Sequence, residues 1–407
     1  MPSPAVAAVP VWASRLNLVG ALLTWVLLVG RLVVNHWHNY GWWSYSAGEW
    51  LINYGGGFVR RGAGQLFLDV PGLSGIAALE LWLVAQWTVI VVLLAVVIRR
   101  VMARTGSGWA IGAWLLPSWF IVGTLQLLWR PFGVTDLQFP TRKEQYYLMV
   151  VLVAVVWWQR RVSWPSVGVV AALLLLGVLF HEGFAPPVTV ALLTVGWWAT
   201  AGARPGRRVG QAVLLVLPAF VAGVAVLLNP GSAGTRVRVW DAVDPATRAW
   251  YLDGDQPPLT EGIPGAMYYL GTTARDGLHQ VQSIFLANSS WVWWVINAVV
   301  VLVAVSVVVL FCDRSAGSLR RLLVPMGLIL LTLLPLFAIA IDWGRWVALL
   351  ANLSLVVGLA GVLMAANTRP MTADRRSVSA FVVVLLVAAV YGLPEIADVS
   401  WGFLGRP

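Results

Sequence analysis

Residues 77–98 read AALELWLVAQWTVIVVLLAVVI, and Arg99 and Arg100 follow directly. A helix of about 20 apolar residues is long enough to cross the ~30 Å hydrocarbon core of a bilayer. Within that core a helix satisfies its own backbone hydrogen bonds, which makes it the default spanning structure. The stretch therefore predicts a transmembrane span that is followed by an arginine pair.

The composition of the whole chain extends this interpretation. Hydrophobic residues make up 59% of the 407 residues, charged residues make up 11%, and the mean hydropathy is +0.81. These values exclude a soluble globular protein, and the sequence lacks the alternating pattern of an outer-membrane β-barrel. The single cysteine, Cys312, excludes an intramolecular disulfide and a cysteine-built metal site.

Similar apolar runs recur along the chain. Together they predict about eleven transmembrane helices and an all-α, polytopic fold in a single membrane domain over residues 1–407. The predicted spans are 15–35, 77–98, 108–129, 146–159, 164–180, 184–201, 209–228, 290–311, 322–341, 346–366 and 377–394.

Basic residues orient these spans. Cytoplasmic connections of membrane proteins carry an excess of Lys and Arg, so the N-terminus is predicted inside and the C-terminus outside. This orientation accounts for the net charge of +10, and nucleic acid is not an expected partner. The predicted inner arginines are Arg15, Arg99, Arg100, Arg104, Arg160, Arg161, Arg204, Arg207, Arg208, Arg314, Arg320, Arg321, Arg369, Arg375 and Arg376.

Acidic residues show the opposite bias. All 17 of them except Asp313 and Asp374 fall on the predicted outer side. Two long outer connections are predicted there: the aromatic and glycine-rich segment 36–76 and the polar segment 229–289. Loops of such length are functional more often than not, so the chemistry is expected on the outer face, at the ends of the helices.

The first outer connection contains GGGFVRRG, residues 55–62. Consecutive glycines allow the backbone to approach a ligand closely or to adopt a positive φ. The guanidinium groups of Arg60 and Arg61 suit phosphate oxygens, which predicts a phosphate-binding loop. The alternative is an interfacial loop whose arginines reach lipid headgroups. Glu49 is either a catalytic base or an ion-pair partner of these arginines.

TRKE, residues 141–144, stands where the fourth span begins. Arg142 and Lys143 are predicted to bind an anion, and Glu144 either pairs with them or takes part in proton transfer. An ordinary charged helix start, with Glu144 favourable at the positive end of the helix dipole, is an equal alternative.

His181 and Glu182 form the polar turn between the fifth and sixth spans, just before Pro186 and Pro187. Ionisable groups at membrane depth are expensive and usually functional, so the pair is predicted to face a water-filled cavity and to orient a substrate. A structural turn is the alternative, and one His–Glu pair is only weak support for metal binding.

DWGR, residues 342–345, lies between the ninth and tenth spans. Asp342 and Arg345 are spaced to pair across one helical turn, and Asp342 is a second candidate base. Trp343 offers a flat face for sugar stacking, although tryptophan also populates membrane interfaces without a site role.

The four motifs together predict an outward-facing cavity. With this topology and its long first outer loop, the chain resembles the GT-C superfamily of integral membrane glycosyltransferases, and the motif set is similar to polytopic proteins of bacterial envelope-glycan loci. The resemblance covers most of the chain as architecture and only the motifs as sequence. It departs from the usual pattern of two neighbouring acids in the first outer loop, because Glu49 stands alone before Asp69.

The resemblance implies an enzyme of the bacterial cytoplasmic membrane that moves a sugar from a polyprenyl-phosphate donor to a glycan or glycolipid acceptor on the outer face. A carboxylate would deprotonate the acceptor, and cations would stabilise the departing phosphate. No cofactor is required by the motifs, and a divalent cation is the one candidate. The alternatives are an envelope polysaccharide polymerase or ligase that uses a lipid-diphosphate glycan, a transporter, or a non-catalytic membrane partner. The candidate catalytic residues are Glu49, Asp342, Glu182 and Glu144, and the candidate substrate-binding residues are Arg60, Arg61, Arg142, Lys143, His181, Arg345 and Trp343.

Overall fold

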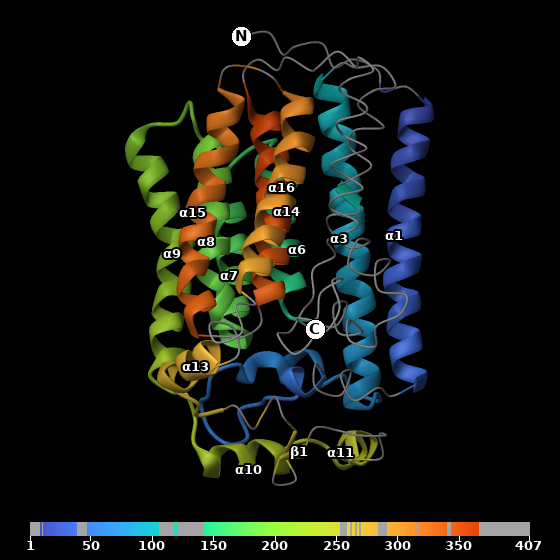
Figure 1. Cartoon of the computed structure of the whole chain (residues 1–407), viewed down its shortest axis with the longest axis vertical. Coiled ribbons are helices and arrows are strands. Elements are labelled where there is room, and N and C mark those ends of the chain that lie inside the picture. The colour runs from blue at the N-terminus through green and yellow to red at the C-terminus, as the bar shows by residue number, and fades with distance from the viewer. Residues whose placement is uncertain are drawn as a thin grey trace.

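The chain forms a bundle of long helices (Figure 1), and apart from one short strand pair the described residues show only helices, turns and connections. The strand pair joins β1 (Leu259–Thr260) and β2 (Ile263–Pro264) in antiparallel register. The computed structural model describes residues 9, 11–38, 47–105, 118–119, 142–252, 259–260, 263–264, 267, 270–283, 291–313, 315, 317–339 and 343–365.

Each predicted span that lies within the described residues corresponds to a helix. The predicted spans 108–129, apart from Ser118 and Trp119, and 377–394 lie outside the described residues. The helices are α1 (Val11–His38), α3 (Gly75–Thr105), α6 (Glu144–Trp158), α7 (Trp164–Phe180), α8 (Ala185–Ala199), α9 (Pro205–Leu227), α14 (Trp291–Cys312), α15 (Ser318–Ile339) and α16 (Trp343–Met364).

Five of these helices, α1, α3, α9, α15 and α16, are long and apolar enough to cross a membrane. The helices α6 and α7 and the second half of α14 are shorter apolar segments. The protein is therefore a multi-pass membrane protein with an all-α membrane domain.

The helix boundaries follow from a few residues. Ser163 and Ser166 form a reciprocal capping box at the start of α7, and prolines stand in the first turns of α7, α8 and α9, where the missing N–H is not needed. The second predicted span, 77–98, lies within α3, and the helix continues past the arginine pair to Thr105. Arginine is a good helix former, so nothing in the pair stops the helix.

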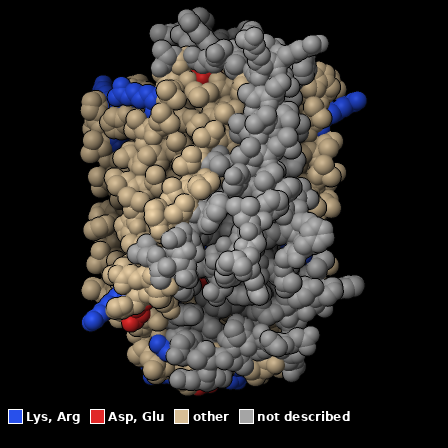
Figure 2. Space-filling view, in the orientation of Figure 1, with Lys and Arg blue, Asp and Glu red and all other residues tan. Residues whose placement is uncertain are grey.

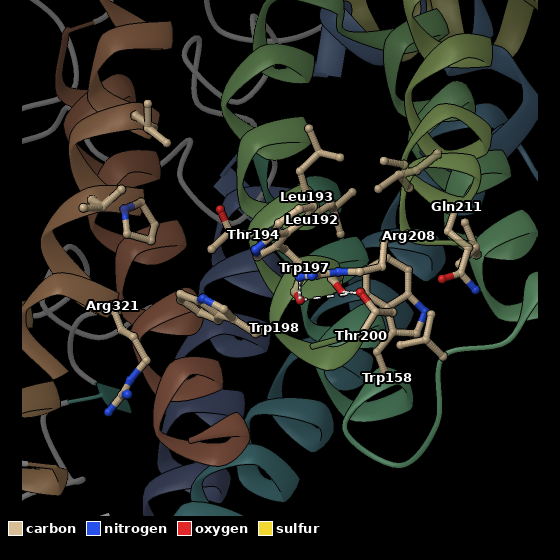
Figure 3. Close-up of a pocket in the computed structure, with 18 of the residues that line it drawn as sticks. Trp158, Leu192, Leu193, Thr194, Trp197, Trp198, Thr200, Arg208, Gln211 and Arg321 are labelled. Carbon is tan, nitrogen blue, oxygen red and sulfur yellow. Dashed lines mark hydrogen bonds between the residues drawn. The ribbon is translucent and has the colours of Figure 1, made fainter. Parts of the chain in front are cut away.

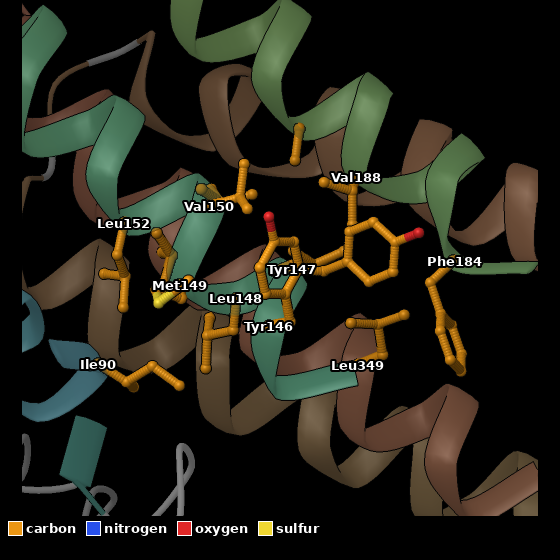
Figure 4. Packing of buried hydrophobic residues seen from close by; sticks show 14 of the residues in the cluster. Ile90, Tyr146, Tyr147, Leu148, Met149, Val150, Leu152, Phe184, Val188 and Leu349 are labelled. Carbon is orange, nitrogen blue, oxygen red and sulfur yellow. The ribbon is translucent and has the colours of Figure 1, made fainter. Parts of the chain in front are cut away.

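The helix α16 lies at the centre of the bundle. In its membrane-length segment 94% of the residues are buried, against 22% for α1 and 28% for α9 at the periphery. Figure 4 shows α6 within the same core, where its tyrosines and Leu148 lie among Val188 of α8 and Leu349 of α16. The apolar side chains on the outer faces of α1 and α9 are exposed, as expected of helices that contact lipid.

One end of the bundle carries a cap built from the two long connections (Figure 1). The cap contains residues 47–74 with the short helix η1 (Gly62–Phe67), and also α10 (Ala233–Asp241), α11 (Pro245–Leu252) and α13 (Ala274–Val281). Asn53 Nδ2 donates to the carbonyl of Val239 at 2.8 Å. The backbone amide of Arg60 donates to the carbonyl of Asn229 at 3.1 Å. These bonds fix the first connection against the second.

Charged side chains gather at the two ends of the molecule. On the face shown in Figure 2, the described surface between the ends is nearly all uncharged. That distribution suits a bundle whose middle lies in hydrocarbon.

Candidate functional site

Seven charged side chains from four segments form an ionic cluster at the cap end of the bundle. Its centre is Glu49, whose Oε1 lies 3.4 Å from Arg142 Nη1 and 3.6 Å from Arg345 Nη1. Arg345 Nε also donates to Glu144 Oε1. The cluster comprises Glu49, Arg61, Arg142, Lys143, Glu144, Glu182 and Arg345, and its cations outnumber its carboxylates.

The segments meet because of where the helices begin and end. Residues 142–144 start α6, Arg345 lies in the first turn of α16, and Glu182 lies in the 3-10 turn η4 (Glu182–Phe184) between α7 and α8. Glu49 lies in a helical turn of the first connection. The charged side chains of the ionic cluster thus come from three helix ends and one loop that lie close together.

Glu49 is enclosed by its partners. Its side chain is only 3% exposed, and burial alone would raise its pKa. The positive charges around it, first Arg345 and then Arg142, outweigh burial and hold the pKa at about 2, against an ordinary value of 4.5. Glu49 is therefore ionised at neutral pH and is a weak base.

Arg61 and Glu182 form the more accessible part of the ionic cluster. Arg61 Nε lies 3.7 Å from Glu182 Oε1, and the two side chains are 23% and 13% exposed. Arg61 has φ 66° and ψ 7°, in the left-handed region. A non-glycine residue there costs about 1–2 kcal/mol and is often found at functional sites.

Lys143 is fully buried among aromatic rings. Its Nζ donates to the carbonyl of Phe180 at 3.1 Å and lies 5.4 Å from the ring centre of Trp50. Burial lowers the pKa of Lys143 to about 7, although Glu49 opposes the shift. A methyl group on Gly64 would lie 2.5 Å from the carbonyl oxygen of Trp50 and 3.3 Å from Lys143 Nζ, so glycine is needed for this close packing.

His181 is buried beside the ionic cluster. Its ring stacks on Phe184 with 4.1 Å between ring centres, and its carbonyl accepts from the Tyr147 hydroxyl at 2.6 Å. Burial, with Arg61 and Arg345 nearby, lowers the pKa of His181 well below its ordinary value, so the ring is neutral. Between the described side chains of His181 and Glu182 there is no hydrogen bond. The structure therefore places Glu182, rather than a His–Glu pair, against Arg61.

The glycine run of the first connection packs closely against α10 and Ala242, the residue that follows it. A methyl group on Gly55 would lie 2.3 Å from Ala242 Cβ, and one on Gly56 would lie 3.0 Å from the carbonyl oxygen of Thr235. The run thus allows close packing against α10. Gly57 has the positive φ, 98°, that the sequence suggested.

Arg60 points toward the second connection, where its Nη2 donates to Thr272 Oγ1 at 3.2 Å. Burial lowers the pKa of Arg60 to about 10, helped by the neighbouring Arg61, so the side chain stays charged at neutral pH. Arg60 and Arg61 therefore face different surroundings.

The DWGR motif contributes Arg345 to the ionic cluster. Asp342 lies outside the described residues, so its predicted pairing with Arg345 stays a prediction. Trp343 is half-buried and packs edge-on against Phe337 at 5.3 Å, and Trp346 lies 5.0 Å from Phe184. These contacts make both tryptophans part of the helix packing.

The motif analysis missed the aromatic wall of the site, which includes Trp50, Tyr147 and Phe184. Tyr147 anchors the turn at His181, and Trp50 covers Lys143. Their positions next to Glu49, Glu144 and Glu182 in sequence were the available signal, but aromatic residues are too common in this chain to single them out.

No group of three or more His, Cys, Asp or Glu within the described ranges has an arrangement suited to a metal ion. Comparisons with models of protein families, with curated proteins and with solved structures found no match.

Proposed function

We propose that the protein is a membrane glycosyltransferase. It would move a sugar from a polyprenyl-phosphate-linked donor to a glycan or glycolipid acceptor on the outer face of the bacterial cytoplasmic membrane. The observation that supports this proposal is the largely buried ionic cluster, in which three arginines and Lys143 lie among three carboxylates beside the apolar bundle. A lipid phosphate is the anion that meets a membrane protein at such a place.

The burial of the ionic cluster favours a functional role. Removing charges from water costs several kcal/mol per ion, and apolar residues would usually hold the helices together at least as well. Perturbed charged groups of this kind concentrate at functional sites. Arg61 adds backbone strain at the same place.

The cations would act on the donor. Arg61 would bind the phosphate and stabilise the charge that it gains as the sugar leaves, and the buried charges of Arg142 and Lys143 behind it would add to the positive potential at this place. Glu49 and Glu144 would hold Arg142 and Arg345 in position, since both carboxylates are enclosed by those arginines. They are positioning residues in this scheme.

Glu182 would act as the base. Its side chain is 13% exposed, against 3% for Glu49 and 6% for Glu144, and a base must reach the proton that it removes. The acceptor oxygen attacks the anomeric carbon, the bond from that carbon to the phosphate oxygen breaks, and the phosphate keeps the electron pair. The hydroxyl proton passes to Glu182.

The test separates donor binding from transfer. With purified protein and a panel of polyprenyl-phosphate-linked sugars, Glu182→Gln should lower turnover about 10²–10⁴-fold and leave donor binding nearly unchanged, whereas Arg61→Gln should weaken donor binding. Asp241→Asn is the matched control, because Asp241 is an exposed carboxylate of the same cap. Asp342→Asn tests the second candidate base by the same two measurements.

Two results would contradict the proposal at different levels. Full turnover by Glu182→Gln would remove Glu182 from the mechanism without removing the activity. Binding of a lipid-diphosphate glycan, with no binding of any polyprenyl-phosphate sugar, would replace the proposed reaction by that of a polymerase or ligase.

A further inference from the structure

A second polar site lies at the opposite end of the bundle from the cap. A pocket of about 660 Å³ opens where α8 packs against both α9 and α15. The helix α8 begins beside the ionic cluster and ends at this pocket. In Figure 3, Arg208 and Gln211 lie on the α9 side and Arg321 on the α15 side, with Trp197 and Trp198 of α8 between them.

The polar lining of the pocket is cationic. Arg208, Arg320 and Arg321 line it, and none of its lining residues within the described ranges is Asp or Glu. Arg321 is paired with Asp313 at 2.5 Å, and Arg208 stacks on Trp197 with 3.5 Å from its guanidinium carbon to the ring centre. The pocket therefore keeps an excess of positive charge, and a headgroup amine would find no counter-charge on its walls.

Two of the residues that line the pocket carry buried polar groups. Gln211 is 5% exposed and Trp158 is 2% exposed. Within the described part of the chain, neither the amide atoms of Gln211 nor Trp158 Nε1 has a hydrogen-bond partner. These atoms are enclosed by the side chains around them, so the polar contacts that the pocket offers to a ligand come from the arginines.

The remaining wall is apolar and continues into the lipid-facing surface. Leu192, Leu215, Val324 and Leu328 line the pocket, and Val324 and Leu328 are exposed toward the outside of the bundle. A ligand bound there has a charged end at the arginines and an apolar end in the bilayer.

We infer that this pocket binds an anionic phospholipid of the adjacent leaflet. The arginines hold the phosphate, and an acyl chain follows the leucine wall. Basic pockets between transmembrane helices suit such headgroups. The site is independent of the proposed transfer reaction, because it shares no residue with the ionic cluster.

The test measures lipid binding to the full chain in detergent by native mass spectrometry, with phosphatidylglycerol and phosphatidylcholine of equal chain length. We expect the wild type to prefer phosphatidylglycerol. Arg320→Gln, which changes an exposed side chain, should weaken that binding about tenfold. Arg161→Gln is the control, since it removes a charge from the same end outside the pocket.

Three results would overturn the inference. Equal binding of the two lipids would remove headgroup recognition. An equal loss in Arg161→Gln and Arg320→Gln would show general attraction to the charged end and no pocket. Full competition by soluble glycerol phosphate at the concentration of the lipid would assign the site to a free phosphate compound.

Discussion

Arginines lie at both ends of the bundle, but their surroundings differ. At the cap end, Arg142 and Arg345 are buried and contact carboxylates that come from distant parts of the chain. At the opposite end, Arg100 and Arg207 donate to backbone carbonyls, Arg100 to Val156 at 2.8 Å and Arg207 to Val162 at 2.9 Å. The same side chain thus belongs to a buried ionic cluster at one end, whereas at the other it binds backbone carbonyls in the last turn of α6 and in the connection after it.

The two kinds of surroundings lead to different contributions of the arginines to the stability of the fold. The last carbonyls of a helix have no partner within it, and a basic side chain that binds them stabilises the helix modestly. A buried cluster must be complete, because removing one ion leaves its partners charged and out of water. The cap end is therefore the more sensitive of the two, and the following substitutions test that ranking.

The largest loss of stability is expected for Arg345→Gln. Glu49 and Glu144 both lose their shared cation, and leaving buried charges uncompensated costs about 3–5 kcal/mol in the free energy of unfolding. Thermal unfolding followed by tryptophan fluorescence measures the change. Arg248→Gln is the control, because its exposed pair with Asp241 at 3.8 Å should contribute at most about 1 kcal/mol. Equal effects of the two substitutions would contradict the ranking.

A smaller loss of stability, which depends on pH, is expected for Glu49→Gln. The pKa of Glu49 is about 2 in the folded protein, below its ordinary value of 4.5. Its ionised form therefore stabilises the fold fully above about pH 4.5, and this contribution is lost as the pH falls toward 2. The stability difference between the wild type and Glu49→Gln should shrink over that range. A difference that stays constant with pH would show that the carboxylate charge is not the cause.

At the opposite end, Arg100→Gln should reduce stability by about 1 kcal/mol. It removes the donor to Val156 and a second bond to Gln159 Oε1, also at 2.8 Å. Denaturation in the same detergent gives the comparison with Arg345→Gln. A loss as large as that of Arg345→Gln would mean that the two ends do not differ in the way described.

The smallest effect is expected for Arg99→Gln. Arg99 is exposed, and surface substitutions of this kind change stability by at most about 0.5 kcal/mol. Thermal unfolding followed by tryptophan fluorescence measures this change in stability. Arg99→Gln should match the wild type within this limit, and a larger loss would reveal a role for the exposed arginines that the structure does not show.

The sequence alone determined the membrane helices, although predicted starts such as 209 and 322 lie four residues inside the observed helices, which begin at Pro205 and Ser318. Long apolar runs leave the backbone no alternative to a helix in hydrocarbon, and prolines and serines mark first turns, as at Ser163 and Pro205. It also singled out the charged motifs around Glu49, Glu144, Glu182 and Arg345. Charges that stand next to long apolar runs are conspicuous in any sequence of this composition.

Only the tertiary structure decided how these charges are paired and which are accessible. Arg345 contacts Glu144 and Glu49, which no local spacing indicates, because ion pairs depend on which helix ends meet in space. The glycine run packs against α10, since close packing and ligand approach require the same residue. The pocket between α8, α9 and α15 also depends on packing, because its lining residues come from helices that meet only in the folded protein.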